Sequence, residues 1–184
     1  MSSTRAAVRT NAKSSSSKPF LVQDLPPAKD VAVGWSHACV IARDGGVYCW
    51  GLNPLGELGD GTTSNASLPV RVSGLTGASR LGAGIGNSCA ATDAGSVMCW
   101  GADFDGPGVK GIVFHSTTPV SIPYTQGIVK VANGRNFVCG VHETGQVTCW
   151  GSNLFRQLGV SRDRFGGRAG GVALVEEVLD AKDV

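Results

Sequence analysis

Hydrophobic residues in this chain come in short stretches that glycine and turn residues separate, and they lack the spacing of an amphipathic helix. The clearest pair of stretches is residues 38–42 and 46–51, which are joined by Arg43-Asp44-Gly45. Short apolar runs bounded by turn residues are typical of β-strands. We therefore predict an all-β fold, and no segment of the sequence favours a helix of useful length.

The hydrophobic pattern repeats every fifty residues, and repeats of this length decide the architecture of a chain. A pair of cysteines recurs in each repeat, and a tryptophan follows the second cysteine: Cys39, Cys49 and Trp50; Cys89, Cys99 and Trp100; Cys139, Cys149 and Trp150. The register divides the chain into repeats of residues 31–80, 81–130 and 131–184.

The turn chemistry fixes how each pair of stretches aligns. If Cys39 faces Cys49, the residues left over form a three-residue loop that ends at Gly45. Three-residue hairpin loops favour glycine at this place, because its backbone adopts a left-handed conformation. Gly95 and Gly145 occupy the same place. The aligned cysteines fall on a non-hydrogen-bonded position, where Cα atoms lie about 4.5 Å apart.

The six cysteines allow three interpretations. The facing pairs favour a disulfide within each hairpin, namely Cys39–Cys49, Cys89–Cys99 and Cys139–Cys149. Zinc fits poorly, because the spacing differs from that of zinc knuckles, and reduced thiols packed as small apolar groups are the third interpretation. Disulfides need an oxidising compartment and favour a site outside the cytoplasm, although the sequence shows no secretory signal.

Further short strands flank each hairpin. The segment 30–33 precedes the first hairpin, and Pro69–Val72 follows it, matched by Pro119–Ile122 and Val172–Val175. We expect proline at the first residue of a strand, where it removes no ladder hydrogen bond. Each repeat then holds about four short antiparallel strands.

These residues resemble the regulator of chromosome condensation repeat. The first repeat carries Gly34-Trp35-Ser36-His37, Asp44-Gly45, Trp50-Gly51-Leu52-Asn53 and Gly56-Glu57-Leu58-Gly59-Asp60-Gly61. The third repeat carries Trp150 to Gly159, whereas the second departs from the pattern after Trp100-Gly101. The resemblance covers residues 21–184 and implies a partial β-propeller of about three four-stranded antiparallel blades. The cysteine pairs are more similar to those of bacterial tandem-repeat proteins, and the resemblance places His37 toward the propeller shaft, where we expect a packed, hydrogen-bonded ring.

Charge separates the start of the chain from the rest. The net charge is +2, and only 16% of the 184 residues are charged. Residues 1–20 are basic and serine-rich, and we expect them to form a disordered tail, because they offer little apolar surface to bury. The near-neutral remainder makes nucleic acid an improbable partner. No apolar run is long enough to span a membrane.

We interpret Trp50, Trp100 and Trp150 as packing residues between blades, since large aromatic side chains dominate core burial. Trp35 lies outside their register, and it is the first candidate for an interaction surface. The most divergent loops, residues 104–116 and 162–171, supply the other candidates: Phe104, Phe114, Arg164 and Phe165.

No motif for catalysis, a metal or a cofactor is present, so we assign no catalytic, metal-binding or cofactor-binding residue. We predict a non-enzymatic repeat module that binds proteins through its loops. One alternative, which rests on the resemblance alone, is nucleotide exchange on a small GTPase with attachment to chromatin. Another is a truncated fragment of a longer repeat protein.

Propellers of this kind commonly close a ring, which takes about seven blades. With three repeats, we expect apolar faces on the two terminal blades, and hence self-association or packing against further repeats. The residues expected on these faces are Val40, Ile41 and Trp50 in the first blade and Val138, Val141 and Trp150 in the third.

Overall fold

The computed structural model describes residues 16, 18–19, 21–102, 115–159 and 173–175. Within these residues the chain forms three four-stranded antiparallel sheets and no helix. The strands of the first sheet are β1 (Ala28–Val33), β2 (His37–Ala42), β3 (Val47–Gly51) and β4 (Ala66–Arg71). Those of the second are β5 (Ala78–Ala83), β6 (Asn87–Thr92), β7 (Val97–Gly101) and β8 (Ser116–Ile122). Those of the third are β9 (Ile128–Asn133), β10 (Phe137–His142), β11 (Val147–Gly151) and β12 (Ala173–Val175).

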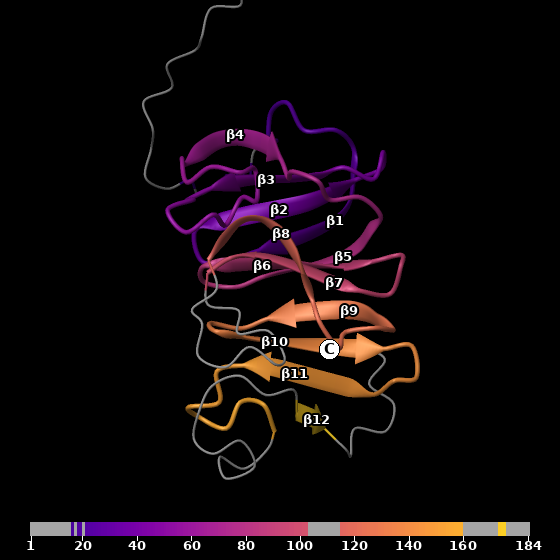
Figure 1. The fold of residues 1–184 in the computed structure, drawn as a ribbon. Coiled ribbons are helices and arrows are strands. Elements are labelled where there is room, and N and C mark those ends of the chain that lie inside the picture. Colours follow the sequence, from indigo (N-terminus) through magenta and orange to yellow (C-terminus); the bar gives the residue numbers. More distant parts are fainter. Residues whose placement is uncertain (1–15, 17, 20, 103–114, 160–172, 176–184) are drawn as a thin grey trace, which may run out of the picture.

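Each sheet is a meander in which neighbours in sequence are neighbours in space, so each repeat folds as one blade. The blades are stacked face to face along the chain, with the first at the top and the third at the bottom of Figure 1. Strand β5 contacts β1 and β2, and β9 contacts β5 and β6. The first strands of successive blades therefore lie next to one another.

The predicted hairpin register is confirmed. In the first blade Cys39 faces Cys49, Val40 faces Tyr48 and Ile41 faces Val47. The backbone of Gly45 adopts a φ of 84°, and its N–H donates to the Ala42 carbonyl at 3.0 Å. The same pairing recurs in the other two blades.

The expected start of the fourth strand is wrong. Strand β4 begins at Ala66, and Pro69 lies inside it. A register shift between Cys49 and Gly51 lets Gly51 pair with Ala66, which extends the strand toward the N-terminus. Pro69 is accepted there because β4 is an edge strand, in which one row of backbone groups has no ladder partner.

Each blade has two chemically different faces. Residues paired across neighbouring strands share a face, so Val33, Ala38 and Trp50 lie together on the first blade. We call this the tryptophan face. The opposite, disulfide face carries Cys39 and Cys49.

The disulfide face of one blade packs against the tryptophan face of the next. Between the first and second blades, one buried cluster includes Cys39 and Cys49 together with Leu81 and Trp100. Between the second and third blades, another buried cluster unites Cys89, Cys99, Val131, Val138 and Trp150. The chain thus contains the same interface twice.

Our expectation for the terminal faces is partly wrong. Ile41 is fully buried against the second blade, and Val138 and Trp150 are fully buried against the second blade from the other side. Successive strand residues point to opposite faces, so Val40 and Ile41 cannot share one. Val40 does lie on the tryptophan face of the first blade, but it is buried on the middle strand between Val31 and Tyr48.

Close contact between blades requires glycine directly after the first strand of the first two blades. A Cβ atom on Gly34 would lie 2.5 Å from the carbonyl oxygen of Gly84. A Cβ on Gly84 would likewise collide with the carbonyl of Gly134. Any larger residue would push the first strands of adjacent blades apart, which explains why the repeat keeps glycine at this position.

Candidate interaction surfaces

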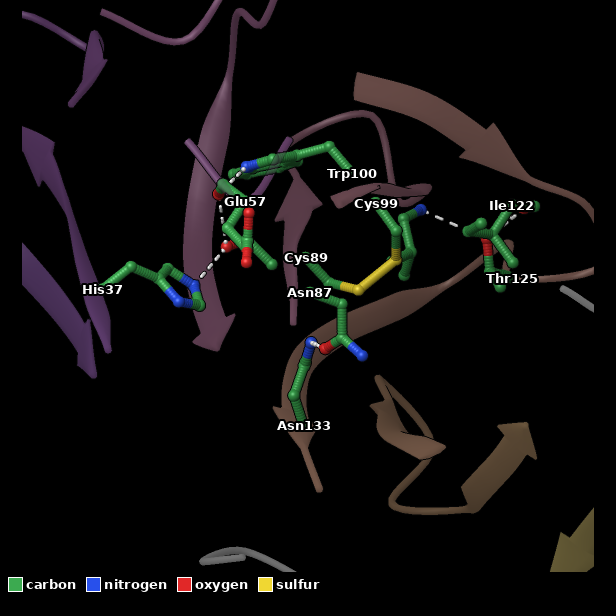
Figure 2. Close-up of a disulfide and its surroundings, with 11 residues drawn as sticks. His37, Glu57, Asn87, Cys89, Cys99, Trp100, Ile122, Thr125 and Asn133 are labelled. Atoms are coloured by element: carbon green, nitrogen blue, oxygen red, sulfur yellow. Dashed lines mark hydrogen bonds between the residues drawn. A yellow bond between two sulfur atoms is a disulfide. The ribbon is translucent and has the colours of Figure 1, made fainter. Parts of the chain in front are cut away.

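A hydrogen-bonded group of buried polar atoms joins the first and second blades. The Glu57 carbonyl accepts from Trp100 Nε1 at 2.8 Å and from the Ser88 hydroxyl at 3.0 Å. His37 Nε2 lies 2.8 Å from Ser88 Oγ. Figure 2 shows Trp100 bonded to Glu57, with His37 on the other side of Glu57. This group fixes the two blades relative to each other.

His37 is a structural residue of this junction. Its side chain is only 4% exposed, and this burial lowers its pKa from 6.5 to about 4. Since the single Ser88 hydroxyl proton goes to the Glu57 carbonyl, the neutral ring donates from Nε2 to Ser88. The ring is packed and hydrogen-bonded, and this polar contact tightens the junction.

The loop after β3 is held by a buried amide. Asn53 is fully buried; its Oδ1 accepts from Leu58 N at 2.9 Å, and its Nδ2 donates to the Ser64 carbonyl at 3.1 Å. Glu57 Oε2 accepts from Leu55 N at 2.8 Å. These bonds turn Leu58 into the core and Leu55 outward, so the loop presents apolar surface from a fixed backbone.

The third blade repeats this loop. Asn153 Oδ1 accepts from Leu158 N at 3.1 Å, and Gln157 Oε1 accepts from Phe155 N at 2.8 Å. Leu158 is buried, whereas Phe155 is 89% exposed. A loop with the Asn-x-x-Gly-x-Leu-Gly pattern thus buries its leucine and exposes the residue three positions before that leucine. The third blade departs from it only in having Arg156, with a φ of 63°, at the place of the first glycine.

Exposed apolar side chains gather at the end of the blades that carries these loops. Leu52 N donates to the Ser36 carbonyl at 2.8 Å, which ties the loop after β3 to the β1–β2 turn. Leu55 packs over Gly86 in the β5–β6 turn of the second blade. We define the apolar rim as the exposed residues of these turns and loops: Trp35, Leu52, Leu55, Ile85, Leu154 and Phe155.

The opposite end of the blades has a different character. It carries the β-hairpin turns, whose exposed residues are polar or small, including Arg43, Asp44, Asp93 and Glu143. Tyr124, which is 71% exposed, is a large exposed aromatic residue on that side. The hairpin turns are therefore more polar than the turns and loops of the apolar rim.

The structure contains all three predicted disulfides, and none of the six cysteines is free. The bonds join Cys39 to Cys49, Cys89 to Cys99 and Cys139 to Cys149, each with a Cα–Cα distance of 4.1 Å. This pairing supports the disulfide interpretation of the six cysteines. Among the described residues, no group of three or more His, Cys, Asp or Glu side chains could hold a metal ion.

The remaining predicted residues fall in three places. Trp100 and Trp150 are fully buried, while Trp50 is half-buried on the terminal face. Trp35 is 76% exposed. The other candidates and most of the N-terminal tail lie outside the described residues: Phe104, Phe114, Arg164, Phe165 and residues 1–15.

The sequence analysis did not identify the other residues of the apolar rim. Leu52 and Leu55 were passed over as part of the repeat pattern, and Ile85 holds the position equivalent to Trp35. Comparing the repeats at that position would have shown apolar residues in the first two, Trp35 and Ile85, although the third carries Arg135. No described helix is long and apolar enough to cross a membrane.

A stack of four-stranded meanders, one per sequence repeat, defines a repeat protein of the β-propeller class. Models of the Regulator of chromosome condensation (RCC1) repeat match residues 28–57 and 128–157 and, in a second version, residues 44–91. The chain belongs to this repeat family. No curated protein sequence matches it.

Solved structures share the fold. Yeast RCC1 (Prp20) bound to Kap60 has a TM-score of 0.70 and 18% identity, with 84% of this chain and 38% of that chain covered. Prp20p from Saccharomyces cerevisiae, studied for binding to Gsp1p and histones, gives the same score and identity over 84% and 40%. Human WBSCR16 has a TM-score of 0.65 and 20% identity over 80% and 39%. At these identities the likeness establishes the fold, and the chain spans about two fifths of each of these proteins.

Proposed function

We propose that the chain is a non-enzymatic module that binds a protein partner through the apolar rim. One observation carries this proposal, namely that Trp35 is 76% exposed on a hydrogen-bonded turn. Tryptophan is among the residues that contribute most to binding energy at protein interfaces. Trp35 lies on a turn that adjoins the backbone of Leu52 and of Gly84, beside Ile85, and an aromatic residue among apolar ones is typical of an interface core.

The turn that bears Trp35 is ordered before any partner binds. Gly34 N donates to the His37 carbonyl at 2.9 Å, and Trp35 N donates to the Gly84 carbonyl of the next blade at 3.0 Å. A partner would therefore bind without first ordering this backbone, which lowers the entropic cost of association. The bond to Gly84 also fixes the Trp35 turn relative to Ile85.

The proteins with the same fold support a binding role. Yeast Prp20 has been solved bound to Kap60 and studied for its binding to Gsp1p and histones. A second candidate function, which rests on the family resemblance alone, is nucleotide exchange on a small GTPase. Release of labelled nucleotide from such a purified GTPase tests that candidate directly.

The binding proposal is tested with two matched aromatic variants. Trp35→Ala truncates an aromatic side chain on the apolar rim, and Tyr124→Ala truncates one on the opposite end. A partner, recovered with the wild-type chain and then purified, is titrated calorimetrically against each variant. We expect Trp35→Ala to weaken binding by roughly tenfold or more, as for an interface hot spot, while Tyr124→Ala leaves it unchanged. Equal affinities of both variants would refute the apolar rim as the binding surface.

A further inference from the structure

The turns that follow the first strand of each blade bring three residues into one row. Trp35, Ile85 and Arg135 hold the same position in the β1–β2, β5–β6 and β9–β10 turns. Trp35 N donates to the Gly84 carbonyl at 3.0 Å, and a Cβ atom on Gly84 would collide with the Gly134 carbonyl. Each turn therefore lies directly against the next, and the row runs from an aromatic through an aliphatic to a cationic side chain.

Exposure at this position persists where blades are packed on one another. Ile85 is 39% exposed although its blade lies between two others, and Trp35 is 76% exposed although a blade follows it. Arg135 is exposed as well. The row is thus a surface that the packing between blades leaves open, and further blades packed in the same way would leave it open too.

The charge on this surface is confined to one end of the row. Leu55 packs over Gly86 and widens the apolar part beside Ile85. The turns and the loop tip that form the surface contain no acidic residue, and Arg135 is their one lysine or arginine: residues 34–37, 52–56, 84–87 and 134–137. A guanidinium at the edge of an uncharged apolar surface favours a partner with a carboxylate at the matching place.

We propose that this row binds a protein segment that combines apolar side chains with an acidic one. The apolar side chains cover Trp35 and Ile85, and the carboxylate accepts from the Arg135 guanidinium. The inference rests on the proposed function and deepens it, because it names the chemistry of the partner at the apolar rim.

The dimensions of the row suit a short segment. Backbone segments in hydrogen-bonding contact lie about 5 Å apart, so the backbones at Trp35 and Arg135 are separated by roughly 10 Å. About three residues of an extended chain span this distance. A nucleic acid fits the row poorly, because one arginine among apolar side chains lacks the clustered positive charge of a nucleic-acid site.

A library of random short peptides displayed on phage is the probe, and it is selected on the immobilised full-length chain. We expect the enriched peptides to combine aromatic or aliphatic residues with aspartate or glutamate. Selection on Arg135→Glu should enrich lysine or arginine in place of the acidic residues, because the charge on the row is reversed. Peptides without acidic residues on the wild-type chain, or no enrichment at all, would overturn the proposal.

The affinity of one enriched peptide measures the ion pair. The peptide is titrated by fluorescence anisotropy beside a second version in which each carboxylate is replaced by its amide, which tests the contact without any change to the protein. Arg135→Gln should weaken binding of the acidic peptide by roughly two- to fivefold, as for an exposed ion pair, and should leave binding of the amide peptide unchanged. Arg43→Gln, which changes an exposed arginine of a hairpin turn, is the matched control and should bind both peptides like the wild type.

Trp35→Ala separates this inference from the proposed function. If Trp35→Ala weakens binding of both peptides while Arg135→Gln weakens neither, the apolar rim binds proteins but the acidic preference is wrong. If Trp35→Ala changes the affinity of neither peptide, both the proposed function and the inference are wrong. The expected result is that Trp35→Ala weakens both peptides and Arg135→Gln weakens the acidic one alone.

Discussion

His37 illustrates how a repeat position acquires a structural role that its neighbours do not share. The same position carries Asn87 in the second blade and Phe137 in the third. His37 is buried against Ser88 and stays neutral at physiological pH, because burial lowers its pKa to about 4. A buried neutral histidine of this kind makes the stability of the first junction depend on pH.

The sign of this pH dependence follows from the two protonation states. The unfolded chain takes up a proton on His37 below its ordinary pKa of 6.5, whereas the folded chain does so only near pH 4. The stability present at neutral pH is therefore lost progressively as the pH falls from 6.5 to 4, by roughly 3 kcal/mol in total. Urea unfolding at a series of pH values measures this loss.

Two histidine variants test whether His37 causes this pH dependence of stability. His37→Asn, which introduces the residue found at the equivalent position 87, should remove most of this pH dependence in the same window. His142→Asn removes another partly buried histidine, which bonds to Thr148 Oγ1 at 2.7 Å, and serves as the matched control for loss of a histidine. An unchanged slope in His37→Asn would show that another group is responsible.

At the scale of the element, each hairpin has a register that the turn residues favour and that the packing between blades also requires. The loop glycine sets the register, the register aligns the cysteines, and the disulfide face that results packs on the next blade. Closing a hairpin of this size with a disulfide contributes roughly 2–3 kcal/mol by restricting the unfolded chain. The three disulfides differ in their surroundings, since the first two lie between blades and the third lies on a terminal face.

The disulfides should differ in how fast they are reduced. Cys39 and Cys49 are 1% and 0% exposed, and Cys89 and Cys99 are both 0% exposed. In the third disulfide Cys149 is 4% exposed, but Cys139 is only half-buried. A thiolate must reach a sulfur atom to exchange with it. Mild reduction of the native protein should therefore open Cys139–Cys149 first, as timed alkylation and mass spectrometry would show. Earlier opening of Cys89–Cys99 would contradict the burial of the second disulfide between blades.

Local chemistry also explains what could be predicted from the sequence. The Cys39–Cys49 register followed from a single turn, because the glycine requirement of that turn involves few residues. The assignment of Ile41 to the free face failed, because it depends on which neighbour covers each face. The Ser88 and Glu57 partners of His37 could not be predicted either, since they come from a different blade and from a loop carbonyl that no side-chain pattern reveals.

At the scale of the whole molecule, the chain is a stack in which each blade supplies one face to each neighbour. Nearest-neighbour interfaces of this kind determine the stability of repeat proteins. The interior junctions bury whole tryptophan side chains, and the terminal tryptophan face does not. The position of a blade in the stack should therefore decide how much its tryptophan contributes to the free energy of unfolding.

Two truncations of the same residue type measure this difference. Trp100→Ala removes a fully buried side chain and its hydrogen bond to the Glu57 carbonyl, and it should cost about 3–5 kcal/mol. Trp50→Ala removes a half-buried side chain and should cost roughly 1–2 kcal/mol. Chemical unfolding at a protein concentration low enough to keep the chain monomeric provides both values. Equal costs would mean that the first blade is covered in the monomer as fully as the second.

The apolar rim is the feature of the whole molecule on which the proposed function depends. Hydrogen exchange of the chain with and without its bound protein partner tests this most directly, because it reports on every turn at once. We predict slower exchange on binding in residues 34–36, 52–56, 84–86 and 152–156, and no change in the hairpin turns at 43–46, 93–96 and 143–146. Protection confined to the hairpin turns would contradict the account, since it would place the partner on the polar end of the blades.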